Sequence, residues 1–205
     1  MQIFYQAPDR RYLEILIRDL REVLAQPDGR ACADCRLSCS RCTPQSCSCA
    51  CRLNCPDLAS RLSSDPERFP IEPGILPLVH ALSELPLLSS CWSCEGHRDA
   101  EGALHRLPSV WFSSQSLVHP RLMAELFTQL KAKGILQHNW QVAAVDSGSA
   151  LDCVFSIEPR LDGEDASLEV LHADIKALSR SLKSSLHSLA LRHIARLDAE
   201  LAAAA

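Results

Sequence analysis

Residues 32–55 read CADCRLSCSRCTPQSCSCACRLNC, and Pro56 follows the last thiol. Eight of these residues are cysteines, spaced C-x2-C-x3-C-x2-C-x4-C-x-C-x-C-x3-C. They are Cys32, Cys35, Cys39, Cys42, Cys47, Cys49, Cys51 and Cys55. The segment has almost no large apolar side chains for a core of its own, whereas one structural zinc ion contributes about 10–16 kcal/mol of folding free energy. We therefore expect bound metal to decide the fold of this segment.

Zinc is the metal that the spacing favours. The first four cysteines form two C-x2-C pairs, and each pair can place two thiolates on one tetrahedral ion. In an extended chain Cys47, Cys49 and Cys51 project from one side, roughly 6.5–7 Å apart, which is too far for three thiols to wrap one ion. The set is therefore expected to hold about two zinc ions.

Two other interpretations of the cysteines remain open. An iron–sulfur cluster is the alternative cofactor, because CRLNCP resembles the C-x3-C-P end of the bacterial ferredoxin motif, although the rest of that motif is absent. With such a cluster the chain would be a redox protein. Free or disulfide-linked thiols are the third interpretation. The total of 11 cysteines is odd, which a purely disulfide framework would leave unpaired.

The composition bounds the class of protein. The chain has 205 residues, of which 22% are charged and 47% hydrophobic, and a net charge of −4. These values are typical of a globular protein and disfavour nucleic-acid binding through bulk positive charge. The N-terminus does not resemble a secretory signal, and no apolar run is long enough to cross a membrane. The cytoplasm, where thiols stay reduced, is the expected location.

The rest of the chain predicts an α+β fold with a small mixed or antiparallel sheet and packed helices. Helical patterns occupy residues 9–26 (with Asp9 as N-cap), 56–62, 73–85 (with a kink or a later start at Pro77) and 120–134. Strand patterns occupy residues 87–94, 107–114, 140–145 and 151–157, and residues 96–106 read as a loop. On the last strand Cys153 is expected to face the core.

A long helical pattern ends the chain, from about Glu164 to Leu201. One helix of this length would measure about 57 Å, more than a small domain can cover. The spacing of its apolar residues also changes near Leu186, by an extra four-residue step, and such a change can mark a break in a helix. We therefore expect that the helix breaks or that part of it packs on a partner, for which a homo-oligomer is one arrangement.

These patterns divide the chain into four parts: an N-terminal helix (1–29), a cysteine-rich metal module (30–62), a proline-rich linker (63–74) and an α+β domain with the long C-terminal helix (75–205).

A second candidate metal site lies in the segment CWSCEGH. Cys91, Cys94 and His97 offer three ligands within seven residues. Because Cys91 and Cys94 would face opposite sides of a straight strand, shared binding requires a turn near Ser93. Three protein ligands with an open position are typical of catalytic zinc, and Glu95 would then be a candidate general base. The alternative is that Cys91 is a core residue and His97 an ordinary loop residue.

Two functional hypotheses follow. In the first, the module is a zinc-stabilised knuckle of an adaptor that presents arginines to a protein or nucleic-acid partner. Those arginines are Arg30, Arg36, Arg41 and Arg52, which also offset the negative charge of bound thiolates. In the second, the α+β domain is a metalloenzyme with its site at the CWSCEGH loop. The sequence has no phosphate-binding loop and no nucleophile elbow, so it lacks support for nucleotide or serine-hydrolase chemistry.

Overall fold

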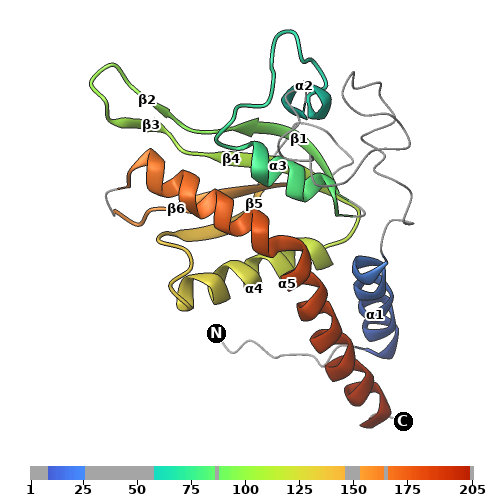
Figure 1. Cartoon of the computed structure of the whole chain (residues 1–205). Helices are drawn as coiled ribbons and strands as arrows, with labels where there is room; N and C mark the ends of the chain where they lie inside the picture. Colours follow the sequence, from blue (N-terminus) through green and yellow to red (C-terminus); the bar gives the residue numbers. More distant parts are fainter. Residues whose placement is uncertain (1–8, 26–57, 86–87, 146–152, 164–165, 204–205) are drawn as a thin grey trace, which may run out of the picture.

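The computed structural model describes residues 9–25, 58–85, 88–145, 153–163 and 166–203 (Figure 1). Its elements are α1 (Arg10–Leu24), α2 (Leu58–Leu62), α3 (Leu76–Ser83), β1 (Leu88–Cys94), β2 (His97–Arg98), β3 (Leu104–Arg106), β4 (Ser109–Ser114), α4 (Val118–Ala132), β5 (Asn139–Val145), β6 (Val154–Arg160) and α5 (Leu168–Ala203). The fold is α+β, as predicted. The eight-cysteine segment lies outside the described residues, and so do the four arginines beside it.

One antiparallel sheet holds β1, β4, β6 and β5 in that order. β2 and β3 form a separate two-stranded ribbon within residues 96–106, where the sequence predicts only a loop. The ribbon forms because the Asp99 side chain accepts hydrogen bonds from the backbone N–H groups of Glu101 and Ala103, and Gly102 adopts a φ of +86°. These contacts close a tight turn that strand periodicity does not reveal.

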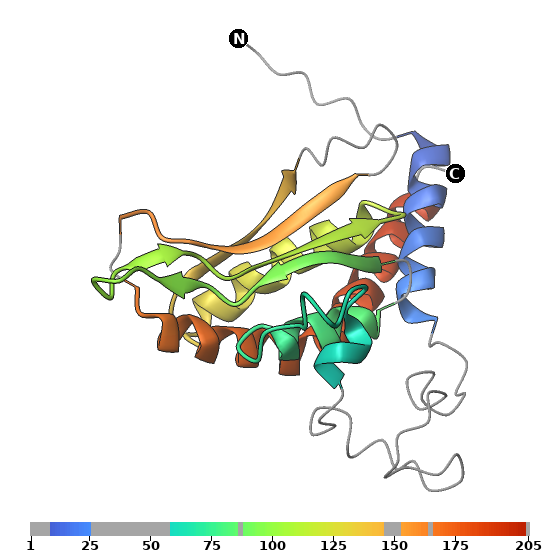
Figure 2. The same cartoon turned by 90° about the horizontal axis from the view of Figure 1, so that it is seen from above.

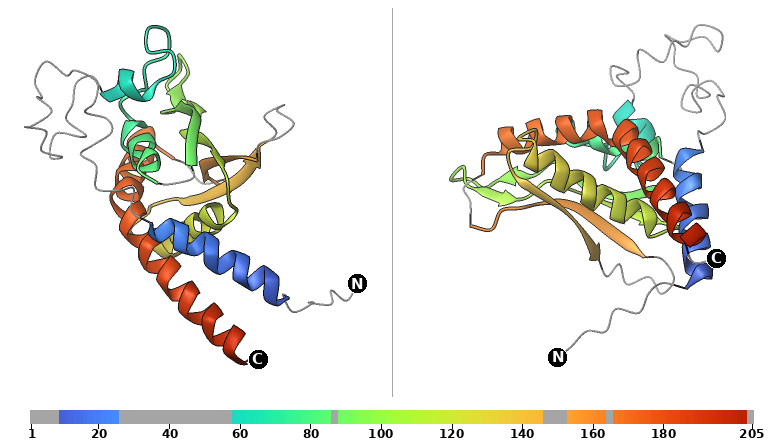
Figure 3. Two further views of the ribbon diagram at one scale, coloured as in Figure 1. Left: turned by 90° about the vertical axis from the view of Figure 1, so that its right-hand side faces the viewer. Right: turned by 90° about the horizontal axis from the view of Figure 1, so that it is seen from below.

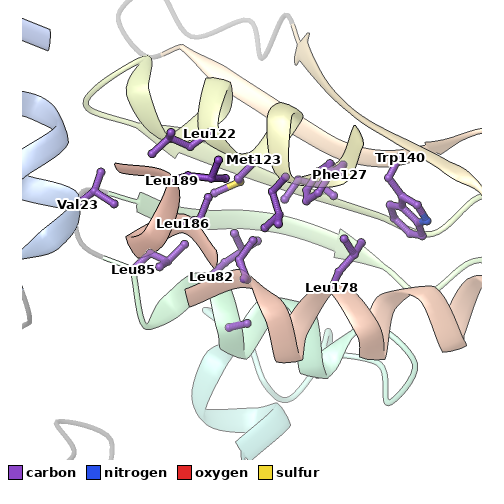
Figure 4. Close-up of a cluster of buried hydrophobic side chains, with 14 of the residues drawn as sticks. Val23, Leu82, Leu85, Leu122, Met123, Phe127, Trp140, Leu178, Leu186 and Leu189 are labelled. Carbon is purple, nitrogen blue, oxygen red and sulfur yellow. The ribbon is translucent and has the colours of Figure 1, made fainter. Parts of the chain in front are cut away.

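Helices α3, α4 and α5 cover one face of the sheet (Figure 2). Val110, Phe112 and Ile157 are fully buried on the strands. They pack in the same core as helix residues such as Phe127 and Leu178 (Figure 4). Cys153 is exposed, so the expectation that it faces the core was wrong, because β6 begins one residue later.

Helix α5 is continuous over 36 residues, so the break, one of the two alternatives that the sequence left open, is absent. Figure 3 shows that it changes direction about halfway along. Serines occupy this region, and the Ser188 hydroxyl donates to the Ser184 carbonyl at 3.0 Å. Such contacts to the preceding turn bend helices without ending them. No helix in the described ranges combines the length and apolar character required to cross a membrane.

Helix α1 packs along the C-terminal half of α5 (Figure 3). The helix begins as predicted, because the Asp9 carboxylate caps it by accepting from the Tyr12 N–H at 2.7 Å. Its apolar stripe, which includes Ile17 and Leu20, belongs to the same core cluster as the sheet and α4. The length of α5 beyond the sheet is therefore covered by a helix of the same chain. A homo-oligomer through α5 stays a prediction.

We expect the protein to lose stability in acid because of His119, a buried histidine in the first turn of α4. It has no exposed surface, and neither ring nitrogen has a hydrogen-bond partner in the described part of the chain. Burial lowers the pKa of His119 to about 4. In the unfolded chain the imidazole of His119 binds a proton below about pH 6.5, whereas in the folded chain it stays neutral until the pH approaches 4. The free energy of unfolding is therefore highest above about pH 6.5 and decreases as the pH falls toward 4. The expected loss is about 3 kcal/mol.

Urea unfolding of the wild type and of His119→Leu between pH 7 and pH 4 measures this effect. The free energy of unfolding should depend less steeply on pH in His119→Leu than in the wild type. In His105→Leu, which changes an exposed histidine on β3, the pH dependence should match that of the wild type. Because other titrating groups contribute equally to all three proteins, they cancel in the comparison. Parallel profiles for all three would contradict the prediction.

Candidate metal centre

Three ligand-type side chains converge beside the end of β1. The carboxylate of Glu72, the sulfur of Cys94 and a ring nitrogen of His97 all lie within 4.8 Å of one another. Cys94 and His97 belong to the site that the sequence predicts. Glu72 was missed, because it lies in the proline-rich segment expected to be a linker.

A two-residue turn brings Cys94 and His97 together. Cys94 ends β1, His97 begins β2, and Gly96 between them has a φ of +91°, a conformation that residues with a side chain rarely adopt. A Cβ atom at Gly96 would lie 2.8 Å from Leu168 Cδ1 and 3.0 Å from the Arg106 carbonyl oxygen. Glycine is therefore required here both for the turn and for its close packing.

Glu72 reaches the site from the segment that leads into α3. The N–H of the preceding residue, Ile71, donates to the Ala59 carbonyl of α2 at 3.4 Å. The Glu72 carbonyl itself accepts from Ile75 and Leu76 at the start of α3. These contacts hold residue 72 between α2 and α3.

One pair of the candidate ligands has the spacing found in a tetrahedral site. Glu72 Oε1 lies 3.3 Å from His97 Nε2. Neighbouring oxygen and nitrogen ligands of a zinc tetrahedron lie roughly 3.3–3.5 Å apart, given bonds of about 2.0–2.2 Å. The Cys94 residue is 2% exposed, whereas the side chains of His97 and Glu72 are 47% and 34% exposed. The sulfur therefore lies inside, and the site opens toward solvent on the side of the other two ligands.

Two consecutive backbone N–H groups donate to these ligands. The Glu95 N–H donates to Glu72 Oε2 at 2.7 Å, and the Gly96 N–H donates to Cys94 Sγ at 3.4 Å. Both contacts fix the orientation of the acceptor side chains, because each backbone N–H points at an atom of the candidate ligand group.

The other residues of the predicted site lie outside this group. Cys91 occupies a bulge of β1, where the register shifts between Ser90 and Trp92, and it is exposed. Partial desolvation raises the pKa of the Cys91 thiol, which favours the protonated, non-ligating form. The Glu95 carboxylate accepts a 2.6 Å hydrogen bond from the Gly74 N–H, so it has a structural partner in place of a free position for base catalysis.

No protein-family model, curated protein or solved structure matches this chain. Function is therefore inferred from the geometry of the described residues and from the spacing of the cysteines.

Proposed function

We propose that this chain is a zinc-binding protein whose α+β domain holds one ion at Glu72, Cys94 and His97. The observation that carries the proposal is the convergence of these three ligand atoms within 4.8 Å. Sulfur, imidazole nitrogen and carboxylate oxygen are the three donor types that bind zinc in proteins. A thiolate and a carboxylate together also neutralise the charge of a divalent ion.

The eight clustered cysteines are proposed to bind about two further zinc ions. Their spacing supports this part of the proposal, and an iron–sulfur cluster is its alternative. The folded module would act as a structural and interaction knuckle in the cytoplasm, where its arginines would contact a protein or nucleic-acid partner. In this proposal the module and the domain site are separate centres.

The domain site also supports a metalloenzyme as the second candidate function. Three protein ligands leave a fourth position for water or substrate, which is the arrangement of catalytic zinc. The half-exposed side chains of His97 and Glu72 favour access from solvent. Because the Glu95 carboxylate is bonded to Gly74, a zinc-bound water would require another proton acceptor.

Zinc analysis of the full-length protein, purified without oxygen, tests the domain site. Cys94→Ser, His97→Gln and Glu72→Gln are each expected to lose about one zinc per chain relative to the wild type, because two remaining ligands bind zinc weakly. Removing the metal with a chelator should lower the melting temperature, since a ligand that binds only the folded state stabilises it.

Cys91→Ser and Cys153→Ser are the matched controls, because both replace exposed thiols outside the group. They should retain the zinc content of the wild type, and circular dichroism should show that every variant is folded. Equal zinc in the wild type and in Cys94→Ser would refute the domain site. If the purified protein were brown and contained iron and sulfide, the cysteine module would hold an iron–sulfur cluster instead of zinc.

A further inference from the structure

The Glu95–Gly96 peptide group links the metal ligands to α5. Its N–H, from Gly96, donates to Cys94 Sγ, and its carbonyl, from Glu95, contacts His172 Nε2 at 2.8 Å. Because a carbonyl oxygen can only accept, the Nε2 atom of His172 must carry the hydrogen. His172 is half-buried on the first turns of α5. One imidazole therefore holds the peptide plane whose N–H points at the buried Cys94 sulfur.

The same turn is held at a second point of α5. Leu168, one helical turn before His172, is the residue whose Cδ1 would lie 2.8 Å from a Cβ atom at Gly96. The two α5 side chains thus restrain the residues between the ligands Cys94 and His97. Residues i and i+4 of a helix share one face, so this restraint follows from the docking of α5.

Gly74 provides the space for this arrangement. A Cβ atom at Gly74 would lie 2.5 Å from His172 Nε2 and 2.7 Å from Glu95 Oε2. Its backbone N–H also donates to that same carboxylate oxygen at 2.6 Å. The imidazole and the carboxylate can approach the chain here only because residue 74 has no side chain.

We propose that His172 is a positioning residue for the metal centre, acting through the Glu95–Gly96 peptide group. This inference rests on the zinc site proposed above. A hydrogen bond to a peptide carbonyl polarises the group and strengthens the bond that its N–H donates. His172 thereby orients and strengthens the N–H contact to the Cys94 thiolate without touching the metal. Loss of a partner that hydrogen-bonds a ligand directly typically lowers metal affinity 10–100-fold. His172 acts one peptide group further out, so we expect the low end of that range, about 10-fold.

Competition with a chelator tests the proposal on the full-length protein, by following the zinc equivalent that is lost in Cys94→Ser. His172→Phe is expected to bind this equivalent about 10-fold more weakly than the wild type. His172→Gln should recover most of the affinity, because its amide can donate to the same carbonyl. His187→Gln, an exposed histidine on the same helix, should leave it unchanged.

Replacing zinc by cobalt gives an absorption spectrum that would not change if His172 had a purely structural role. The Cys94-dependent thiolate-to-cobalt absorption band should shift to longer wavelength in His172→Phe, because a sulfur with a weaker hydrogen bond gives up electron density more easily. His172→Gln should restore the position of the band. An unchanged band and an unchanged affinity in folded His172→Phe would overturn the inference.

Gly74→Ala is the second variant and keeps every ligand and His172 itself. Its added methyl group must displace the imidazole or the Glu95 carboxylate, so it should lower zinc affinity in the same direction as His172→Phe. Wild-type affinity in Gly74→Ala would also overturn the inference. If the wild type and Cys94→Ser bind equal zinc, the metal site itself is absent, an outcome distinct from failure of the positioning role alone.

Discussion

Replacing Asp174 with alanine is expected to lower the free energy of unfolding by about 3–5 kcal/mol. This α5 carboxylate is 1% exposed and accepts three hydrogen bonds. Oδ1 accepts from the Gln137 N–H at 2.8 Å, and Oδ2 accepts from the His138 N–H at 3.0 Å and from Trp140 Nε1 at 3.1 Å. Alanine would leave all three donors without this acceptor. The contacts of His138 and Trp140 are buried, and each buried donor that loses its partner costs about 1–3 kcal/mol.

Urea unfolding under reducing conditions measures the loss. Asp174→Asn keeps the volume but turns an NH2 group toward N–H donors, so it should also be destabilised, by about 2–3 kcal/mol. Asp198→Asn, an exposed position on the same helix whose ion pair with Arg21 spans 4.0 Å, should change stability by less than about 0.5 kcal/mol. If Asp174→Ala were as mild as Asp198→Asn, the network would not hold the loop between α4 and β5.

Replacing Ile17 with aspartate should destabilise the protein by about 4 kcal/mol or more. Ile17 is 4% exposed in the core cluster, on the stripe of α1 that packs against α5. The substitution removes an apolar contact and places a charge where no water reaches it, so α1 is expected to detach from α5. Hydrogen exchange should then become faster in α1 and in the C-terminal half of α5.

Ile15→Asp is the matched control, because it makes the same change on the same helix at a position that is 38% exposed. It should alter stability by about 1 kcal/mol at most. Equal stability of the two variants would mean that α1 is an appendage, as a division at residues 1–29 implies. A large difference would establish that α1 is part of the domain core.

Helix α5 connects the core to the candidate metal centre. His172 and Asp174 lie two residues apart, and each holds a different loop: the Glu95–Gly96 turn after β1 and the segment before β5. The register of the sheet places the end of β1 and the start of β5 at the same end. The first half of α5 therefore organises that end of the sheet, and the second half packs with α1.

Half of the candidate metal site was visible in the sequence. Cys94, Gly96 and His97 are neighbours in the chain, and a glycine between two ligands indicates a turn. Glu72 carried no such signal, because it precedes Cys94 by more than 20 residues and sits among prolines. The sequence did contain a signal for Asp174. This residue lies on the same helix face as the apolar residues Leu171, Ile175 and Leu178, where a charged side chain requires buried partners.

The features that could be predicted from the sequence are local. Alternating and 3.6-residue patterns and caps such as Asp9 are read from neighbouring residues, so the α+β class and the order of its main elements were predicted. Pairing of distant segments was decided by the tertiary structure. The contacts of α1 with the second half of α5, of Asp174 with the loop before β5 and of Glu72 with Cys94 and His97 join residues that no short-range pattern relates. They form because burying shared apolar surface selects one arrangement of the elements, and the polar contacts follow from that arrangement.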